Sequence, residues 1–221
     1  MQLSTAEENY LKAIFKISER KKGTVSTKAI SEVVETSAAS VTDMLKRLAE
    51  KDLIIYEKYK GVKLSSTGLE RATLLVRKHR LWEVFLVERL NFGWEEVHEI
   101  AEQLEHIQSE ELVDRLEDHL NFPKFDPHGD PIPDKRGVIT LRQQSPISNL
   151  SIHQQGIIVG VSNSDTEFLL FLEDMGLVLG TRIKVVKKFD FDNTILIEVE
   201  DKGKQTLSNK VAKNINVQLK N

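Results

Sequence analysis

Apolar and polar residues alternate with two different periods along this chain. In the first half, apolar positions recur every three to four residues, which is typical of amphipathic helices. The pattern predicts helices over residues 5–18, 27–34, 38–51, 67–90 and 94–108. Between the third and fourth of these lie two β-prone runs around Tyr59-Lys60-Gly61, which predict a hairpin. Beyond residue 150, short apolar runs separated by turn residues predict strands instead.

The N-terminal elements have the arrangement of a winged helix-turn-helix. Two short helices joined by the turn Glu35-Thr36-Ser37 place the second helix where it can enter a DNA major groove. Small and hydroxyl side chains near its start can approach bases, and cations further along and in the wing can meet phosphates. The predicted DNA contacts are Thr27, Ser37, Ala39, Ser40, Thr42, Asp43, Lys46, Arg47, Lys58 and Lys60.

The predicted helix over 94–108 has a polar strip beside its apolar face. The strip consists of His98, Glu102, Glu105 and His106, which are neighbours across successive helical turns. Glu102 and Glu105 repel each other, by roughly 0.2–0.5 kcal/mol on a helix surface. A divalent cation would reverse that repulsion, so the strip predicts most of a metal site.

A second group of ligand-type side chains is predicted from the preceding helix. His79 and Glu83 are spaced i, i+4 and share one face, and with His98 they would complete a second site. The remaining histidines that lack such spacing, His119, His128 and His153, are expected to have structural or surface roles.

The C-terminal third is expected to be a small β domain. All five prolines fall between residues 123 and 146, which predicts an extended linker. Strands are predicted over 156–161, 182–189, 194–200 and 215–219, with one short helix over about 165–175. This content suggests an SH3-like barrel. The expected domains are 1–72 (DNA binding), 73–122 (helical, metal binding and dimerisation), 123–150 (linker) and 151–221 (SH3-like), an α+β protein overall.

Composition narrows the function classes. The 221 residues contain no cysteine, which excludes disulfides and thiolate metal sites. No apolar run approaches a membrane span and the N-terminus lacks a secretory pattern, so we expect a cytoplasmic protein. Residues 1–72 carry 13 Lys and Arg against 10 Asp and Glu, a net of +3, and residues 73–140 carry 8 against 15, a net of −7. This asymmetry suits an anionic partner at one end and cations in the middle.

Several segments together resemble one family. EENYLKAIF, YEKYKGVKLSSTG, RKHRLWEVFL, VHEIAEQLEHIQSEEL and FDPHGDPIP are similar to the diphtheria toxin repressor family of metal-dependent transcriptional regulators. The resemblance covers nearly the whole chain, including a C-terminal domain that shorter relatives lack. It implies a winged helix-turn-helix, a helical dimerisation domain and an SH3-like domain.

The resemblance also implies ligand sets. The implied primary site is Asn9, Glu102, Glu105 and His106, and the implied ancillary site is His79, Glu83 and His98. The SH3-like domain of the family can lend ligands, for which Asp165 and Glu167 are candidates; Ser164 and Glu167 also form a capping box. Glu102 stands where iron-sensing relatives have Cys, and Lys12 stands where some manganese regulators have a second ligand Glu.

These observations predict a repressor of metal-ion homeostasis that is not an enzyme and takes no small organic substrate. Oxygen and imidazole donors without thiolates favour Mn²⁺, with Fe²⁺ as the alternative, and Zn²⁺, Co²⁺ or Ni²⁺ are expected to bind in vitro. Metal would join the first helix to the dimerisation domain and fix the spacing of two recognition helices on operator DNA in a homodimer. Two alternatives stay open: a metal-independent winged-helix regulator and a metal-dependent hydrolase.

Overall fold

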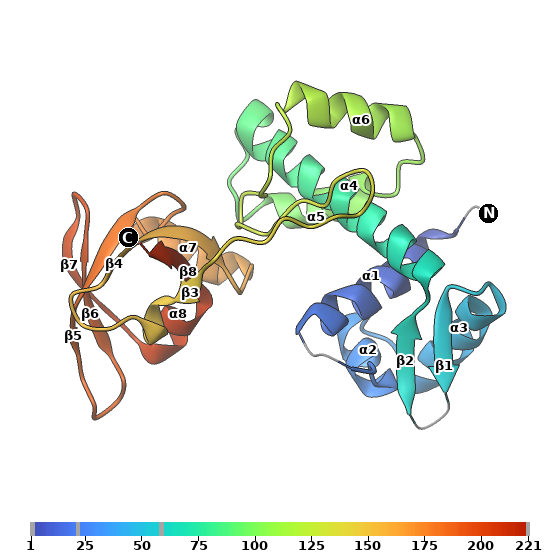
Figure 1. Cartoon of the computed structure of the whole chain (residues 1–221), viewed down its shortest axis with the longest axis horizontal. Helices are drawn as coiled ribbons and strands as arrows, with labels where there is room; N and C mark the ends of the chain where they lie inside the picture. Colours follow the sequence, from blue (N-terminus) through green and yellow to red (C-terminus); the bar gives the residue numbers. More distant parts are fainter. Residues whose placement is uncertain (1–2, 21–22, 58–59, 220–221) are drawn as a thin grey trace. The chain divides into compact units, whose positions relative to one another are not determined.

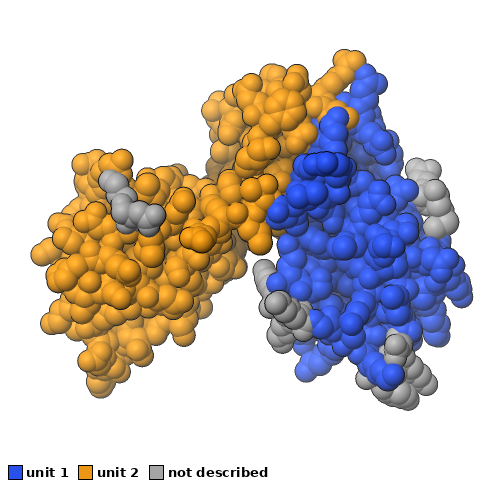
Figure 2. All heavy atoms as spheres, in the orientation of Figure 1, with its two compact units in different colours: residues 1–79, 102–113, 133–139 blue, residues 80–101, 114–132, 140–221 orange. Residues whose placement is uncertain are grey.

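The computed structural model describes residues 3–20, 23–57 and 60–219, which divide into two compact units (Figure 2). Unit 1 consists of residues 1–79, 102–113 and 133–139. Unit 2 consists of residues 80–101, 114–132 and 140–221. Among the described residues, the helices over 66–90, 97–104 and 110–119 contribute residues to both units.

Unit 1 begins with the winged helix-turn-helix (Figure 1). Its elements are α1 (Thr5–Arg20), α2 (Thr27–Val33), α3 (Ala38–Glu50), β1 (Ile54–Glu57) and β2 (Gly61–Leu64). Serine hydroxyls cap the two short helices: Ser26 Oγ accepts from the Ala29 amide and Ser37 Oγ from the Ser40 amide, both at 3.2 Å. Glu35 adopts a left-handed φ of 49°, which lets the chain reverse tightly between α2 and α3. The predicted helices differ from these only at their ends.

A single apolar cluster holds the winged helix-turn-helix together. Leu11, Ile14, Ile30, Leu45 and Leu48 are all fully buried within it, so one face of each helix meets the others. The wing leads directly into the long helix α4 (Ser66–Leu90), whose first turn is capped by Ser65 Oγ. Gly68 is required there, because a β-carbon would lie only 1.8 Å from the Leu53 carbonyl oxygen.

The predicted helix over 94–108 is shorter in the structure. It becomes α5 (Val97–Leu104), and residues 105–106 form a turn. The next helix, α6 (Glu110–His119), begins immediately afterwards and is capped by Ser109 Oγ, which accepts from the Leu112 amide. An N-cap residue has extended backbone, so the chain must leave the helical conformation before Ser109. Glu105 and His106 therefore lie just past the end of α5 rather than within it.

The C-terminal part of unit 2 is an antiparallel sheet with two helices, as expected for an SH3-like domain. Its strands are β3 (Ser145–Pro146), β4 (Gln155–Val161), β5 (Arg182–Lys188), β6 (Ile195–Val199), β7 (Gly203–Leu207) and β8 (Ile215–Leu219). The order across the sheet is β3-β8-β4-β5-β6-β7. The 3-10 helix η1 (Ile147–Asn149), α7 (Thr166–Asp174) and α8 (Asn209–Asn214) complete the domain. The sequence prediction did not include β3, β7 or α8.

Alternation along these strands builds the core of the domain. In β6, Ile195, Ile197 and Val199 are buried and the residues between them are not, the period-two pattern of a half-buried strand. Leu169 and Leu172 of α7 pack into the same cluster. The predicted fold class is thereby confirmed: a winged helix-turn-helix, a helical region and a C-terminal SH3-like sheet. Among the described residues, helices that are long and apolar enough to traverse a membrane are absent.

Candidate metal centre and DNA-binding face

The predicted DNA contacts gather on exposed surface of the winged helix-turn-helix. Ser37, Ala39, Ser40, Asp43, Lys46 and Arg47 are exposed, Thr27 and Thr42 are half-buried, and Lys60 is exposed at the wing. Lys58 lies outside the described residues. Lys46 pairs with Asp43 at 3.2 Å on this surface, and the Thr42 hydroxyl donates to the Ala38 carbonyl. The first turns of α3 therefore present small and polar side chains on exposed surface, as a recognition helix requires.

Two carboxylates of the polar strip, Glu102 and Glu105, contact a buried lysine side chain in unit 1. The Lys12 ammonium, on α1, donates to Glu102 Oε1 at 2.6 Å and to Glu105 Oε2 at 2.5 Å, and lies 3.2 Å from His79 Nδ1. His79 Nδ1 is in turn 2.7 Å from Glu105 Oε2. His79 and Glu105 are buried, so these charges interact where solvent screens them weakly.

His106 is oriented by a carboxylate on α1. Its Nδ1 lies 2.5 Å from Glu8 Oε2, and Gln108 Nε2 donates to the other oxygen of Glu8 at 3.0 Å. The remaining ring nitrogen, Nε2, faces Glu105 Oε1 at 3.8 Å. Metal-ligating histidines typically have this arrangement, in which one nitrogen bonds a carboxylate and the other faces the ion.

Two oxygen atoms predicted to bind metal are buried without a hydrogen-bond partner. They are Asn9 Oδ1 and Glu105 Oε1, both enclosed by their surroundings. A buried acceptor with no partner costs about 1–3 kcal/mol, so such atoms call for an explanation. An ion bound by both would satisfy them. Oxygen and imidazole donors of this kind suit a hard divalent cation. The structure brings one ligand atom each of His79, Glu102 and Glu105 within 4.8 Å of one another. Binding of a cation by the set Asn9, Glu102, Glu105 and His106 stays a prediction.

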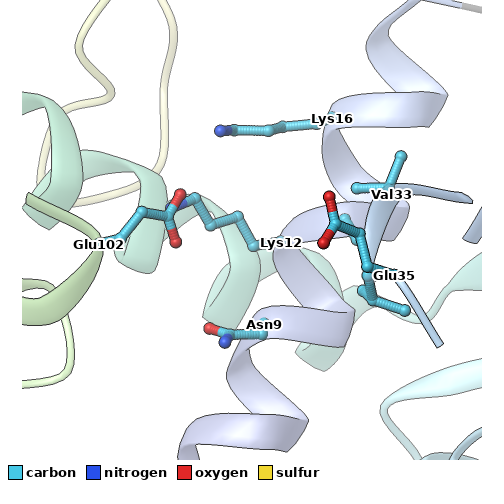
Figure 3. A pocket seen from close by; sticks show the side chains of 8 residues that line it. Asn9, Lys12, Lys16, Val33, Glu35 and Glu102 are labelled. Carbon is cyan, nitrogen blue, oxygen red and sulfur yellow. The ribbon is translucent and has the colours of Figure 1, made fainter. Parts of the chain in front are cut away.

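A pocket of about 300 Å³ opens next to this strip. Figure 3 shows Asn9, Lys12 and Lys16 of α1 on one wall, with Glu102 on one side and Val33 and Glu35 on the other. Burial raises the pKa of the Glu102 carboxyl, but the charge and hydrogen bond of Lys12 lower it further, so the net pKa lies below its ordinary value. Glu102 is therefore ionised at neutral pH and can act as a ligand.

Unit 2 contains a second carboxylate–histidine cluster, which the sequence prediction missed. Glu83, Asp126 and His128 are buried, and each offers a donor atom within 4.8 Å of the others. His128 Nε2 donates to the Trp94 carbonyl at 2.8 Å, which leaves Nδ1 facing Glu83 Oε2 at 3.7 Å. Of the two roles expected for His128, structural or surface, its burial excludes the surface one.

Protons and an arginine balance the charge of this second cluster. Burial, with the charges of Glu83 and Asp130, raises the pKa of Asp126 to about 7. Burial lowers the pKa of His128, but its contact with Glu83, the charges of Glu83 and Asp126 and the hydrogen bond to the Trp94 carbonyl raise the net value to about 9. Arg80 lies 3.5 Å from both Asp126 and Asp130. The cluster is thus a strongly anionic buried environment, in which positive charge is favoured.

The other predicted ligands have mixed placements. Within unit 2, His98 Nδ1 lies 3.1 Å from Glu83 Oε1, so these two predicted ancillary ligands are brought together. His79 belongs to unit 1, and the set of three as a whole stays a prediction. Asp165 caps α7, since its Oδ1 accepts from the Phe168 amide. The cap predicted at Ser164 is therefore wrong by one residue, and ligation by Asp165 and Glu167 stays a prediction.

Comparison with protein families now places the chain. Residues 2–62 match the model "Iron dependent repressor, N-terminal DNA binding domain". Residues 65–134 match "Iron dependent repressor, metal binding and dimerisation domain", and residues 145–219 match "FeoA domain". The chain belongs to the iron-dependent repressor family, which includes the diphtheria toxin repressor. The resemblance inferred from the sequence motifs is confirmed, and members of this family are transcriptional regulators.

Two individual relatives match this chain over most of its length, and a third matches one segment. A solved structure of a manganese-dependent transcriptional repressor in complex with manganese is 32% identical, covers 97% of this chain and all of its own, and superposes with a TM-score of 0.87. The iron-dependent repressor IdeR of Mycobacterium bovis is 29% identical over 83% of this chain and 85% of its own length. A 70-residue segment is 49% identical to part of a probable metal transport system membrane protein of Chlamydia trachomatis, but spans only 16% of that protein.

Proposed function

We propose that this chain is a repressor whose affinity for operator DNA is increased by Mn²⁺. The proposed Mn²⁺ ligands are Asn9, Glu102, Glu105 and His106. The observation that supports this ligand set is the pair of partnerless buried oxygens, Asn9 Oδ1 and Glu105 Oε1. Oxygen and imidazole donors suit manganese or iron(II) better than softer metals, and the chain has no cysteine to offer. Fe²⁺ is the alternative, because relatives named for either metal match the chain.

The proposed ligands come from two segments of the chain that are far apart in the sequence. Asn9 lies on α1 and belongs to the DNA-binding region, whereas Glu102 lies on α5 and Glu105 and His106 directly follow it. When bound, the cation would supply the positive charge that draws these oxygen and nitrogen donors together. Glu8 contributes by holding His106 with its Nε2 turned toward Glu105. Binding of the cation would thereby fix the position of α1 relative to Glu102, Glu105 and His106.

The pose of α1 has consequences for the recognition helix. Glu7, adjacent to Glu8, accepts a hydrogen bond from Lys51 Nζ at 2.5 Å, directly after the end of α3. α1 and α3 also share the apolar core of the winged helix-turn-helix, so they move as one body. In a homodimer, the two recognition helices must lie about 34–36 Å apart to meet successive turns of DNA. Fixing α1 therefore fixes the geometry on which operator binding depends.

We further propose that Glu83, Asp126 and His128 of unit 2 bind an ancillary cation, with His98 contributing through its contact to Glu83. The support is the mutual proximity of three buried donors and the raised pKa values of Asp126 and His128, which show how strongly the cluster favours positive charge. Carboxylate and imidazole donors again suit manganese or iron(II).

Operator binding with and without metal tests the main proposal. An operator is first selected from random duplex DNA with the Mn²⁺-loaded protein, and affinity is then measured by fluorescence anisotropy. Mn²⁺ should strengthen wild-type binding by about 5–150-fold, the usual range of allosteric coupling. Glu105→Ala and Asn9→Ala should lose most of this gain, whereas Glu99→Ala, an exposed position on α5, should retain it. Wild-type binding that is independent of metal would overturn the proposal.

A further inference from the structure

A lysine side chain is buried inside the proposed metal centre. Only 4% of Lys12 is exposed, and its ammonium lies within 3.2 Å of one atom each of His79, Glu102 and Glu105. Figure 3 shows the side chain extending from α1 toward the Glu102 carboxylate. Burying an ammonium is costly unless charged partners compensate it, so this position is maintained by the acidic strip itself.

The ammonium uses the same kind of atom that a divalent cation would use. It engages Glu102 Oε1 and Glu105 Oε2, while Glu105 Oε1 has no hydrogen-bond partner. A metal ion at Asn9 Oδ1 and Glu105 Oε1 would therefore share the Glu105 carboxylate with Lys12. Two cations on one carboxylate repel each other, and each withdraws charge from the other's ligand.

Lys12 and Asn9 lie one helical turn apart on α1, so they face the strip from the same side. The side chain of Lys16, a further turn along, lines the same pocket. Lys12 is more deeply buried than Lys16 and donates directly to Glu102 and Glu105, the carboxylates on which the proposed metal site depends.

We propose that Lys12 is a resident cation of the metal centre that competes with the divalent ion for Glu102 and Glu105. It weakens metal binding and so sets the metal concentration at which the repressor responds. The ammonium also ties α1 to the strip through contacts of its own, which makes it a positioning residue for the ligands. This inference rests on the proposed function, because it assumes that the strip binds a metal.

The test is a manganese titration of the full-length chain. Electron paramagnetic resonance of the aqueous Mn²⁺ signal counts free ions directly, without any need for DNA. Titrations are made in a His128→Asn background, so that the cluster of unit 2 does not contribute. Lys12→Gln should bind Mn²⁺ at the strip more tightly by about tenfold or more, because a competing charge in direct contact is removed. Lys12→Arg keeps the charge, so its Mn²⁺ affinity should stay within about threefold of that of the parent.

Lys16→Gln is the comparison variant, since it removes the same charge from the same helix one turn further along, where the side chain lines the pocket beside Glu102. Its gain in affinity should be clearly smaller than that of Lys12→Gln, because Lys16 is only half-buried and solvent screens its charge more strongly than that of Lys12. Thermal unfolding gives a second readout: Mn²⁺ should raise the melting temperature of Lys12→Gln more than that of the parent. Lys12→Met repeats the test if the Gln variant does not fold.

The outcomes separate the two proposals. Equal or weaker Mn²⁺ binding by Lys12→Gln, with the parent binding normally, overturns the role of Lys12 and leaves the metal site intact. An equal gain from Lys16→Gln also overturns it, because the effect would then be general electrostatics. A parent chain that binds no Mn²⁺ at the strip overturns the proposed function itself.

Discussion

The two carboxylate–histidine clusters of this chain balance their negative charge in different ways. In unit 1, Glu102 and Glu105 meet a lysine ammonium delivered by α1. In unit 2, Glu83 and Asp126 are compensated by the proton of His128 and by Arg80. The first cluster depends on a helix of the DNA-binding region, whereas the second is built from α4 and the segment after α6. A ligand that replaces these charges should therefore move α1 in one case and mainly stabilise its own unit in the other.

The largest effect that separates the clusters should come from His128. His128→Asn removes a ring nitrogen facing Glu83, and the proposed cation of unit 2 should be lost, with an affinity drop beyond the 10–100-fold typical of outer partners. Equilibrium dialysis should show one Mn²⁺ fewer per chain. Metal affinity at the strip of unit 1 should stay within about threefold, since the ligands there are untouched.

The same variant can contradict the comparison in two ways. If the metal count equals that of the wild type, the buried cluster is held by protons and Arg80 alone and has no metal role. If operator binding becomes metal-independent, the cluster of unit 2, not the strip, is the switch. Asp130→Asn serves as a control, because this carboxylate contacts Arg80 but its side chain is largely exposed.

The contrast between the clusters also explains which one the sequence could predict. Glu102, Glu105 and His106 lie within five consecutive residues, so helical spacing alone brought them together, although the helix ends at Leu104. Glu83 and Asp126 are separated by α5 and α6, and no periodicity connects them. The available signal was Asp126-x-His128 within FDPHGDP, where prolines and a glycine favour a tight, inward-folding loop.

Contacts between residues far apart in the sequence could not be predicted either. Nothing in the spacing of Lys12 and Glu105, 93 residues apart, indicates that their side chains meet, because that contact depends on how α1 packs in unit 1. The fold was more predictable: most helices and strands follow from the hydrophobic period, although α6 and α8 were not predicted. The strand β7, with exposed Gly203 and Lys204, has too little apolar alternation to be found. Local pattern specifies elements, and tertiary packing specifies which charges become neighbours.

A smaller effect should come from Glu8, which tests whether the strip depends on α1 beyond its ligands. Glu8→Gln keeps the shape but weakens the bond to His106 Nδ1, so Mn²⁺ affinity should fall by about 10–100-fold, as for other partners of metal-bound histidines. The visible spectrum of the Co²⁺-loaded protein should shift in position while its coordination number is kept. This combination marks a positioning residue rather than a ligand.

Gln108→Ala is the matched control, because Gln108 contacts the other oxygen of Glu8 at the exposed surface. It should leave Mn²⁺ affinity within about threefold, as expected for an exposed hydrogen bond. An unchanged affinity in Glu8→Gln would show that His106 is oriented by its backbone turn alone, and that α1 joins the site only through Asn9 and Lys12.

The smallest effect should come from Lys51, which tests whether the hold on α1 extends to the recognition helix. Burial raises the pKa of the Glu7 carboxyl, but the hydrogen bond from Lys51 and the contacts with Ser4 lower it below its ordinary value overall. A lowered folded-state pKa means that Glu7 contributes stability at neutral pH and that this contribution disappears as the pH falls through the folded-state pKa. Lys51→Met should therefore reduce the free energy of unfolding by about 1 kcal/mol at pH 7 and by less in acid, measured by urea unfolding.

Lys46→Met, which breaks only the exposed pair with Asp43, should have little effect at either pH. An equal loss from both variants would mean that the Glu7–Lys51 contact behaves as ordinary surface charge, and that α1 and α3 are joined by their apolar core alone.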